Sequence, residues 1–172
     1  MSHALTVVLD DKLVTLNAAV GLLRRRNLPL RSVAFGPHVT EGRSRLFVMI
    51  DADEASARRV ALLFEKLVGV ESARITAAGD MVVRESALIT LQPGPTGYAE
   101  LLDVLSLYHA TVIEEGPEVL VAELTGPEAF VLSCLRAVEP FGIVDVARSG
   151  AVAIARPVPA SPASTPSEVR VP

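Results

Sequence analysis

Two hydrophobic patterns alternate along the chain and predict short strands separated by helices. Runs rich in β-branched residues, such as ALTVVL at residues 4–9, are typical of buried strands. Apolar residues spaced three or four apart are typical of a helix with one buried face. The first stripe of this second kind consists of Leu13, Leu16, Val20 and Leu23. Because the two patterns take turns, the sequence predicts a fold that mixes strands and helices.

The first half of the chain predicts the order strand, helix, strand, strand, helix, strand. Asp10-Asp11 is the expected N-cap of the first helix, and Asn27 is expected to end it in a left-handed turn. Asp53 is expected to cap the second helix, and Gly69 is placed to end it. The second helix carries an apolar stripe at Val60, Leu63, Phe64 and Leu67. The remaining strands are expected at residues 30–35, 44–51 and 70–77.

The second half repeats this order. Its strands are expected at residues 83–91, 111–115, 119–124, 143–146 and 151–155. Its helices carry apolar stripes, one at Leu101, Leu102, Leu105 and Tyr108, the other at Phe130, Val131, Cys134, Leu135 and Val138. Thr96 is the expected cap of the first of these helices, and Pro127 is expected in the first turn of the second. The sequence therefore predicts an α+β fold of two tandem ferredoxin-like βαββαβ units.

The predicted units divide the chain near residue 79. The first domain is expected at residues 1–78 and the second at residues 79–156, followed by a Pro/Ser/Ala-rich tail at residues 157–172 that is expected to be disordered. A four-stranded sheet with helices on one face leaves its edges and its other face unsatisfied. Because pairing with a second copy would bury an edge, we expect a homodimer.

Composition narrows the functional classes. The chain has 172 residues, half of them hydrophobic, so it has enough apolar material for a core. A net charge of −4, an aromatic content of 4% and the absence of Trp argue against nucleic-acid binding. The sequence contains no apolar run of about 18 residues and no signal-peptide pattern, so we expect a cytoplasmic protein without a membrane span.

No arrangement of reactive residues in the sequence points to catalysis or to a metal. Cys134, the only cysteine, lies on an apolar helical stripe, where a buried hydrophobic role is more common than a nucleophilic one. His3, His38 and His109 do not share the spacing of metal ligands. Nucleotide-binding glycine motifs are absent too. We therefore expect a binding or regulatory module with no catalytic residue, no metal and no cofactor of its own. The rival interpretation, an enzyme on a ferredoxin-like scaffold, would need a cluster of perturbed polar groups in a cleft.

Seven segments between residues 3 and 156 occur in a specific order. They are AVGLLRRR at 19–26, LRSV at 30–33, SR at 44–45, EKLV at 65–68 followed by Val70, VRESALI at 83–89, EPFGI at 139–143 and VARSGAVAI at 146–154. This series resembles the regulatory (small) subunit of acetolactate synthase. The resemblance implies an N-terminal ACT domain followed by a C-terminal ACT-like domain, which agrees with the duplicated pattern.

The resemblance also implies a non-catalytic function. In that family the small subunit binds the large catalytic subunit, which depends on thiamine diphosphate (ThDP). It raises the activity of that subunit and confers feedback inhibition by valine or another branched-chain amino acid. The implied process is the biosynthesis of valine, leucine and isoleucine. ThDP, Mg²⁺ and FAD would belong to the catalytic subunit, and the effector would lie between ACT domains at the dimer interface. The alternative is a stand-alone ACT module that senses an amino acid without a synthase partner.

The implied effector loop departs from the family pattern, which is roughly Asn-x-x-Gly-x-Leu after the first strand. Residues 11–16 read DKLVTL here, so Asp11 replaces an amide with a carboxylate that only accepts hydrogen bonds. Val14 replaces a glycine where the backbone must approach the ligand, and Pro29 replaces an asparagine and lacks an N–H. The expected effector site comprises Asp11, Lys12, Leu13, Val14, Pro29 and Leu30. The three replacements predict that feedback sensing is weakened or lost.

Overall fold

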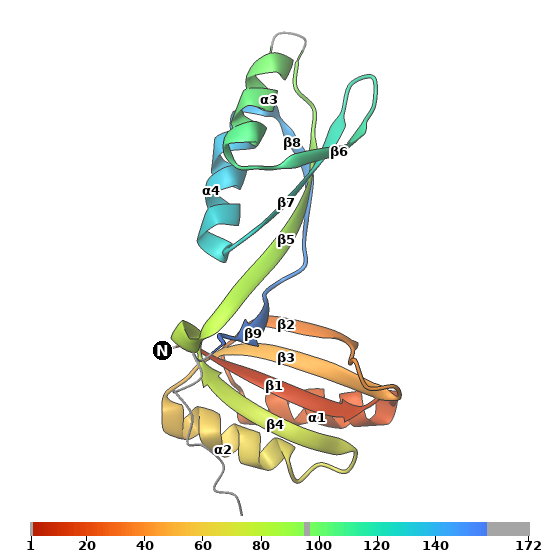
Figure 1. Cartoon of the computed structure of the whole chain (residues 1–172), viewed down its shortest axis with the longest axis vertical. Coiled ribbons are helices and arrows are strands. Elements are labelled where there is room, and N and C mark those ends of the chain that lie inside the picture. The colour runs from red at the N-terminus through yellow and green to blue at the C-terminus, as the bar shows by residue number, and fades with distance from the viewer. Residues whose placement is uncertain (1, 95–96, 158–172) are drawn as a thin grey trace, which may run out of the picture.

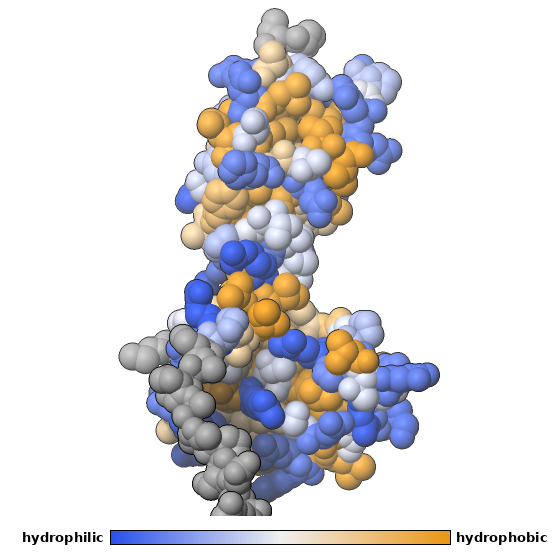
Figure 2. Space-filling model, viewed as in Figure 1, coloured by the Kyte–Doolittle hydropathy of each residue, from blue (hydrophilic) through white to orange (hydrophobic). Residues whose placement is uncertain are grey.

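Strands and helices form two lobes in the computed structural model, which describes residues 2–94 and 97–157. Each lobe is an antiparallel sheet with two helices on one face (Figure 1). The lobes meet at a narrower waist (Figure 2). The repeated order strand, helix, strand, strand, helix, strand confirms the predicted α+β fold with two ferredoxin-like units. The predicted cap at Thr96 and all of the predicted tail except Pro157 lie outside the described residues.

The first lobe is built from the first six elements. They are β1 (Ser2–Asp10), α1 (Leu13–Arg26), β2 (Leu30–Pro37), β3 (Arg43–Asp51), α2 (Glu54–Phe64) and β4 (Val70–Ala77). The strands are ordered β2-β3-β1-β4, so β2 and β4 form the edges of the sheet. Alternate strand residues face the helices. The core between sheet and helices includes Leu5, Val7, Leu46, Val48 and Phe64.

Local side-chain chemistry fixes two helix ends in this lobe. The Asp53 carboxylate accepts hydrogen bonds from the backbone N–H and from the hydroxyl of Ser56, both at 2.8 Å, and caps α2 as predicted. Asn27 ends α1 in the left-handed conformation, with φ of 47°, also as predicted. The second helix ends at Phe64, earlier than predicted, and Gly69 instead occupies the turn into β4 with φ of +86°.

The predicted cap of α1 is wrong. Lys12, not the Asp10-Asp11 pair, is the N-cap residue of this helix. The Asp11 carboxylate is engaged elsewhere, because it accepts a hydrogen bond of 2.9 Å from the Ser44 hydroxyl on β3. A sequence pattern cannot separate a capping carboxylate from one that reaches a neighbouring strand.

The buried face of α1 also differs from the predicted one. Its buried residues are Thr15, Ala19, Leu22 and Leu23. Leu13 and Val20, which belong to the predicted stripe, are 81% and 48% exposed. The predicted stripe is therefore half right: Leu23 is buried and Leu16 packs against the core, whereas the small residues Thr15 and Ala19 occupy other core positions that large apolar spacing does not indicate. The large apolar residues left outside give α1 a second apolar face.

The second lobe repeats the topology of the first. A 3₁₀ turn (Ala78–Asp80) leads into β5 (Met81–Leu91), α3 (Tyr98–Leu107), β6 (Thr111–Glu115), β7 (Leu120–Gly126), α4 (Glu128–Val138), a second 3₁₀ turn (Glu139–Phe141), β8 (Ile143–Arg148) and β9 (Val152–Ala155). The strand order β6-β7-β5-β8 corresponds to that of the first sheet. Both predicted helical stripes contribute to its core, where Leu101, Leu105, Val131, Cys134 and Val138 are buried. Pro127 is the N-cap residue of α4 and not part of its first turn.

A pair of strand segments joins the two lobes. The first residues of β5 pair with β9, and these segments, Met81–Arg84 and Val152–Ala155, form a bridging ribbon. The ribbon packs on the face of the first sheet that points away from α1 and α2 (Figure 1). The cluster buried there consists of Ala4, Phe47, Met49, Met81 and Ala153. The predicted strand at residues 151–155 is therefore present as β9, and it lies over the sheet of the first lobe.

Candidate functional site

Four of the six predicted effector residues surround the start of α1. Asp11, Lys12, Leu13 and Val14 lie in the turn after β1 and in the first helical turn, and all four are exposed. Lys12 makes no capping hydrogen bond through its side chain in the described part of the chain. The first N–H groups of the helix therefore keep their capacity to bind an anion. This end of α1 suits the carboxylate of a small ligand.

Charged groups beside the helix start pair with each other. Lys12 Nζ lies 3.3 Å from Asp10 Oδ2. The Thr15 hydroxyl faces the Asp10 carboxylate and lowers the pKa of Asp10 below its ordinary value; Lys12 acts in the same direction, and together they outweigh the opposing effect of partial burial. Gly69 approaches this carboxylate closely, since a Cβ there would stand 2.8 Å from Asp10 Oδ1. Asp10 is therefore ionised at neutral pH.

The other two predicted residues, Pro29 and Leu30, lie at the opposite end of α1. This helix has 14 residues and is therefore about 20 Å long. A single copy of the chain does not bring the six residues together. A two-fold pairing of two copies along β2 would run their α1 helices antiparallel and would set the start of one beside the end of the other.

Exposed apolar residues gather on α1 and on the edge strand β2. Val33 and Phe35 stand opposite Val48 and Leu46 in the register of β2 and β3, so they face the same side of the sheet as the helices. Each is nonetheless 45% exposed. This α1–β2 surface comprises Leu13, Val14, Val20, Leu30, Val33 and Phe35. Sequence reasoning placed Val20 in the core and assigned Val33 and Phe35 no functional role. The sequence did contain one indication of this surface: α1 has more large apolar residues than a single buried helix face can accommodate.

A cavity of about 430 Å³ lies between the lobes. Two ion pairs line it: Arg31 Nη2 lies 3.0 Å from Glu128 Oε2, and Arg148 pairs with Glu85, which is buried. The Glu85 carboxylate raises the pKa of Arg148 above its ordinary value. The charges of this interlobe cleft are thus neutralised in pairs. No histidine or cysteine of the described ranges lines it.

Hydrogen bonds also cross the waist. The Ser32 hydroxyl accepts a hydrogen bond of 2.7 Å from the N–H of Ala151, and Arg45 Nη2 donates to the carbonyl oxygen of Ala153 at 2.8 Å. Gly150 has a φ of +71°, and a Cβ at this position would stand 2.7 Å from Ser32 Oγ. The edge strand β2 therefore contributes to the α1–β2 surface and at the same time contacts the chain segment that leads out of the second lobe.

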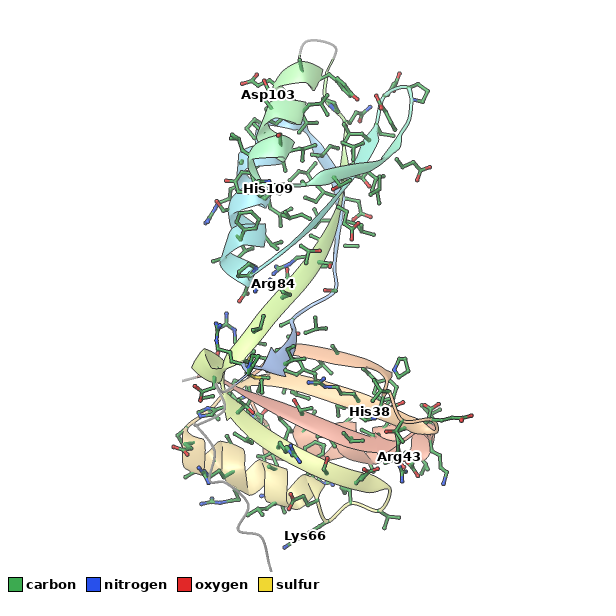
Figure 3. The ribbon with its side chains drawn as sticks, viewed as in Figure 1. His38, Arg43, Lys66, Arg84, Asp103 and His109 are labelled. Carbon is green, nitrogen blue, oxygen red and sulfur yellow. The ribbon has the colours of Figure 1, made fainter. Side chains whose placement is uncertain are left out.

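Reactive side chains elsewhere are buried or dispersed. Cys134 is fully buried, and burial raises the pKa of its thiol, which supports its predicted hydrophobic role. His38 lies in the first lobe and His109 in the second (Figure 3), whereas His3 is buried with its Nδ1 3.1 Å from the carbonyl oxygen of Ala52. Across residues 2–94 and 97–157, no group of three or more His, Cys, Asp or Glu side chains is placed to hold a metal ion. Over those same residues, no helix combines the length and apolar content that crossing a membrane requires.

Comparisons with known proteins converge on one family. A family model described as "Small subunit of acetolactate synthase" matches residues 84–157. The acetolactate synthase small subunit of Mycobacterium bovis is 32% identical over 157 residues, which cover 90% of this chain and 92% of the relative. The corresponding subunit of Mycolicibacterium smegmatis is 28% identical over 155 residues, covering 90% of this chain and 91% of the relative. The crystal structure of the acetolactate synthase small subunit from Thermotoga maritima aligns with a TM-score of 0.84 at 23% identity, covering 91% of this chain and 98% of that one, so the two share the two-lobe fold.

Proposed function

The chain belongs to the acetolactate synthase small-subunit family, and we propose that it is a non-catalytic regulatory subunit that binds and activates a ThDP-dependent catalytic subunit in branched-chain amino acid biosynthesis. The observation that carries the proposal is similarity along almost the whole chain, since 90% of it aligns with 92% of a relative. ThDP, Mg²⁺ and FAD would be held by the catalytic subunit.

The polar side chains support a regulatory rather than an enzymatic role. Catalysis requires a group with a suitable pKa that can reach a bound substrate. The two arginines of the interlobe cleft are instead paired with Glu85 and Glu128. The Cys134 thiol is buried in the second core and is inaccessible to a substrate.

We infer a homodimer that forms through the α1–β2 surface. β2 is an edge strand, so its outer backbone groups can pair with the β2 of a second copy. Val33 and Phe35 would become buried at this junction. The charges favour antiparallel α1 helices, because Asp10 and Asp11 lie at the start of α1 and the exposed run of residues 24–26 (RRR) lies at its end.

The effector site of this dimer would combine the start of α1 in one copy with Pro29 and Leu30 of the other. There Val14 adds a branched side chain at the helix start, and Pro29 offers no N–H. The Asp11 carboxylate accepts a hydrogen bond from Ser44, and it repels a ligand carboxylate where an amide would donate to it. We infer that this chain binds L-valine weakly or not at all.

Isothermal titration of the purified chain with L-valine tests the effector inference. We expect no saturable heat from the native chain. The variant Asp11→Asn/Val14→Gly/Pro29→Asn, which restores the residues usual in the family, should gain a measurable affinity. L-leucine and L-isoleucine are titrated in the same way. Tight, saturable binding of L-valine by the native chain would refute the inference.

Co-purification tests the partner. The tagged full chain is expressed together with the acetolactate synthase catalytic subunit of the same organism, and the product is analysed by size-exclusion chromatography with light scattering. We expect one complex that contains both chains. An unrelated ThDP-dependent enzyme serves as the control and should elute separately. A chain that elutes alone yet binds a branched-chain amino acid would instead be a stand-alone sensor.

A further inference from the structure

The edge strand β2 has an irregularity at Arg31. Leu30 stands opposite Ile50 and Ser32 stands opposite Met49, so two residues of β2 correspond to one residue of β3 at this point. This is the geometry of a β-bulge, which bends a strand and turns the side chain of the extra residue in a new direction. The bulge directly follows Pro29 and Leu30, which are predicted effector residues. It therefore lies between the expected ligand site and the rest of the edge strand.

The side chain of Arg31 extends from this bulge to the second lobe. Its Nη2 donates a hydrogen bond of 3.0 Å to Oε2 of Glu128, the first residue of α4. Its Nε lies 3.9 Å from Oδ2 of Asp51, in its own lobe. We call the contact between Arg31 and Glu128 the interlobe ion pair. Among the ion pairs of residues 2–94 and 97–157, it is the one that joins the two lobes.

Glu128 connects this ion pair to a second one. Glu85 is the main cause of the raised pKa of Arg148, and Glu128 acts in the same direction, so the Glu128 carboxylate faces both arginines of the cleft. A series of alternating charges thus runs from the edge of the first lobe into the second lobe. It consists of Asp51, Arg31, Glu128, Arg148 and Glu85.

The next residue of β2 also holds the second lobe. The Ser32 hydroxyl accepts the hydrogen bond from the N–H of Ala151, in the segment that leaves the second lobe. The strand β5 crosses the waist without a break (Figure 1), pairing with β9 up to Arg84 and with β7 from Glu85 onward. Two successive residues of β2 therefore contact the second lobe at the waist, where the sheets change partners.

Exposure sets the strength of the interlobe ion pair. The side chains of Arg31 and Glu128 are 46% and 51% exposed. An exposed ion pair of this kind shifts an equilibrium by about fivefold at most. This is enough to favour one position of the second lobe and too little to lock it there. The cavity beside the pair leaves room for the start of α4 to move.

We propose that Arg31 is a positioning residue whose ion pair with Glu128 sets the angle between the lobes and makes that angle depend on the edge of β2. A ligand beside Pro29 and Leu30, or a second copy paired with β2, would alter the bend at the bulge and hence the position of Arg31. Coupling is reciprocal, so breaking the ion pair must in turn affect the pairing of β2. This dependence on the edge rests on the homodimer proposed above.

Single-molecule energy transfer between dyes tests the effect on the angle. The dyes are attached at Lys66→Cys and Asp103→Cys, which are exposed and lie in different lobes (Figure 3). An excess of unlabelled chain ensures that each assembly carries one dye pair. We expect Glu128→Gln and Arg31→Met each to shift or broaden the distribution of transfer efficiencies. Combining both variants should add nothing further, and Arg31→Lys, which keeps the charge, should fall between Arg31→Met and the native chain.

The matched control is Glu54→Gln, which removes an exposed ion pair of 2.7 Å with Arg58 inside the first lobe. Its distribution should equal the native one. Circular dichroism establishes that every variant is folded. If Glu128→Gln and Arg31→Met both leave the distribution unchanged, the proposal is refuted.

Sedimentation equilibrium tests the dependence on the edge of β2. Glu128→Gln should raise the dimer Kd about threefold to tenfold, because each dimer contains two interlobe ion pairs. The double variant Arg31→Met/Glu128→Gln should raise it no more than the larger single effect. Additive losses would show that each residue contacts the second copy by itself, which overturns the coupling, as would a Kd equal to that of Glu54→Gln.

The outcomes separate this inference from the proposed function. Neither measurement contains the catalytic subunit, so their failure leaves the proposed regulatory role in place. A native chain that sediments as a monomer at every concentration refutes the homodimer and the dependence on the edge together. The distribution of transfer efficiencies then decides alone whether Arg31 positions the second lobe.

Discussion

Replacing Phe35 with alanine should weaken the inferred homodimer while leaving the chain folded. Phe35 lies on the edge strand β2, and 45% of its surface is exposed in one copy. A phenylalanine side chain exposes about 200 Å² when fully accessible, so about 90 Å² per copy would leave water when two copies pair. The perturbation therefore acts on the interface and only secondarily on the core of the first lobe.

The magnitude follows from that area. At about 25 cal/mol per Å², burial of this surface contributes about 2 kcal/mol per copy. A two-fold dimer buries this surface in both copies, so the contribution is doubled. Because alanine retains a small part of it, the variant loses about 3–4 kcal/mol of dimer stability. Because about 1.4 kcal/mol corresponds to a factor of ten, the dimer Kd should rise by roughly 10²–10³.

Sedimentation equilibrium over a wide range of protein concentrations measures this Kd for the native chain and for Phe35→Ala. The matched control is Val39→Ala, because Val39 is 98% exposed between β2 and β3 and should not contribute. The reasoning is refuted if Phe35→Ala dimerises as tightly as the native chain, or if the control weakens the dimer as much as Phe35→Ala does.

Three further predictions concern the stability and reactivity of the fold. Gly69→Ala should lower the free energy of unfolding by about 1–3 kcal/mol, because φ at this position is +86° and the new Cβ would stand 2.7 Å from Thr15 Oγ1. Urea titration measures this loss, and an unchanged urea midpoint would contradict the prediction. The hydrogen bonds from Ser56 hold the pKa of Asp53 below its ordinary value. The ionised Asp53 cap therefore stabilises the folded state above the unfolded-state pKa of this carboxyl, and that contribution is lost as pH falls through the folded-state pKa. Asp53→Ala should therefore lower the urea midpoint at neutral pH and have little effect near pH 2, and equal losses at both pH values would contradict the assignment. Burial raises the pKa of the Cys134 thiol, so a thiol reagent at about pH 8 should label this residue only after the chain is unfolded in guanidinium. Rapid stoichiometric labelling of the native chain would instead show that the thiol is accessible.

Local chemistry made much of the fold predictable. Asp53 and Asn27 mark helix ends because a capping carboxylate and a left-handed asparagine act within a few residues of the backbone they contact. The strand at residues 70–77 was predicted with its observed bounds, because it directly follows the turn at Gly69 and a glycine turn is itself a local signal. The duplicated order of elements followed from these local signals alone.

Non-local contacts could not be derived in the same way. The run at residues 151–155 predicts a strand, but its composition does not tell which sheet β9 will cover. Hydrophobic spacing in α1 likewise predicts a helix without telling that Leu13 and Val20 stay outside the core. A contact between distant segments depends on how whole elements pack, and a single sequence does not reveal that.

Only part of the candidate effector site could be predicted from the sequence. A resemblance identifies Asp11, Val14 and Pro29 as departures from a family pattern, whereas only the structure shows that Asp11 and Val14 lie at the start of α1 and Pro29 just beyond its end. The sheet of the second lobe illustrates the same limit. The excess of acidic residues in the second half can be counted in the sequence, but only the strand register shows that Glu114, Glu123 and Asp145 share one face.

The rate of acetolactate formation from pyruvate tests the central claim most directly. The catalytic subunit of the same organism is held at a fixed concentration with its cofactors, and the native chain is added in increasing amounts. The rate should rise to a plateau as the two subunits reach stoichiometric amounts, while the chain alone should produce no acetolactate. A catalytic rate that the chain leaves unchanged at every ratio, or product formed by the chain alone, would contradict its assignment as a regulatory subunit.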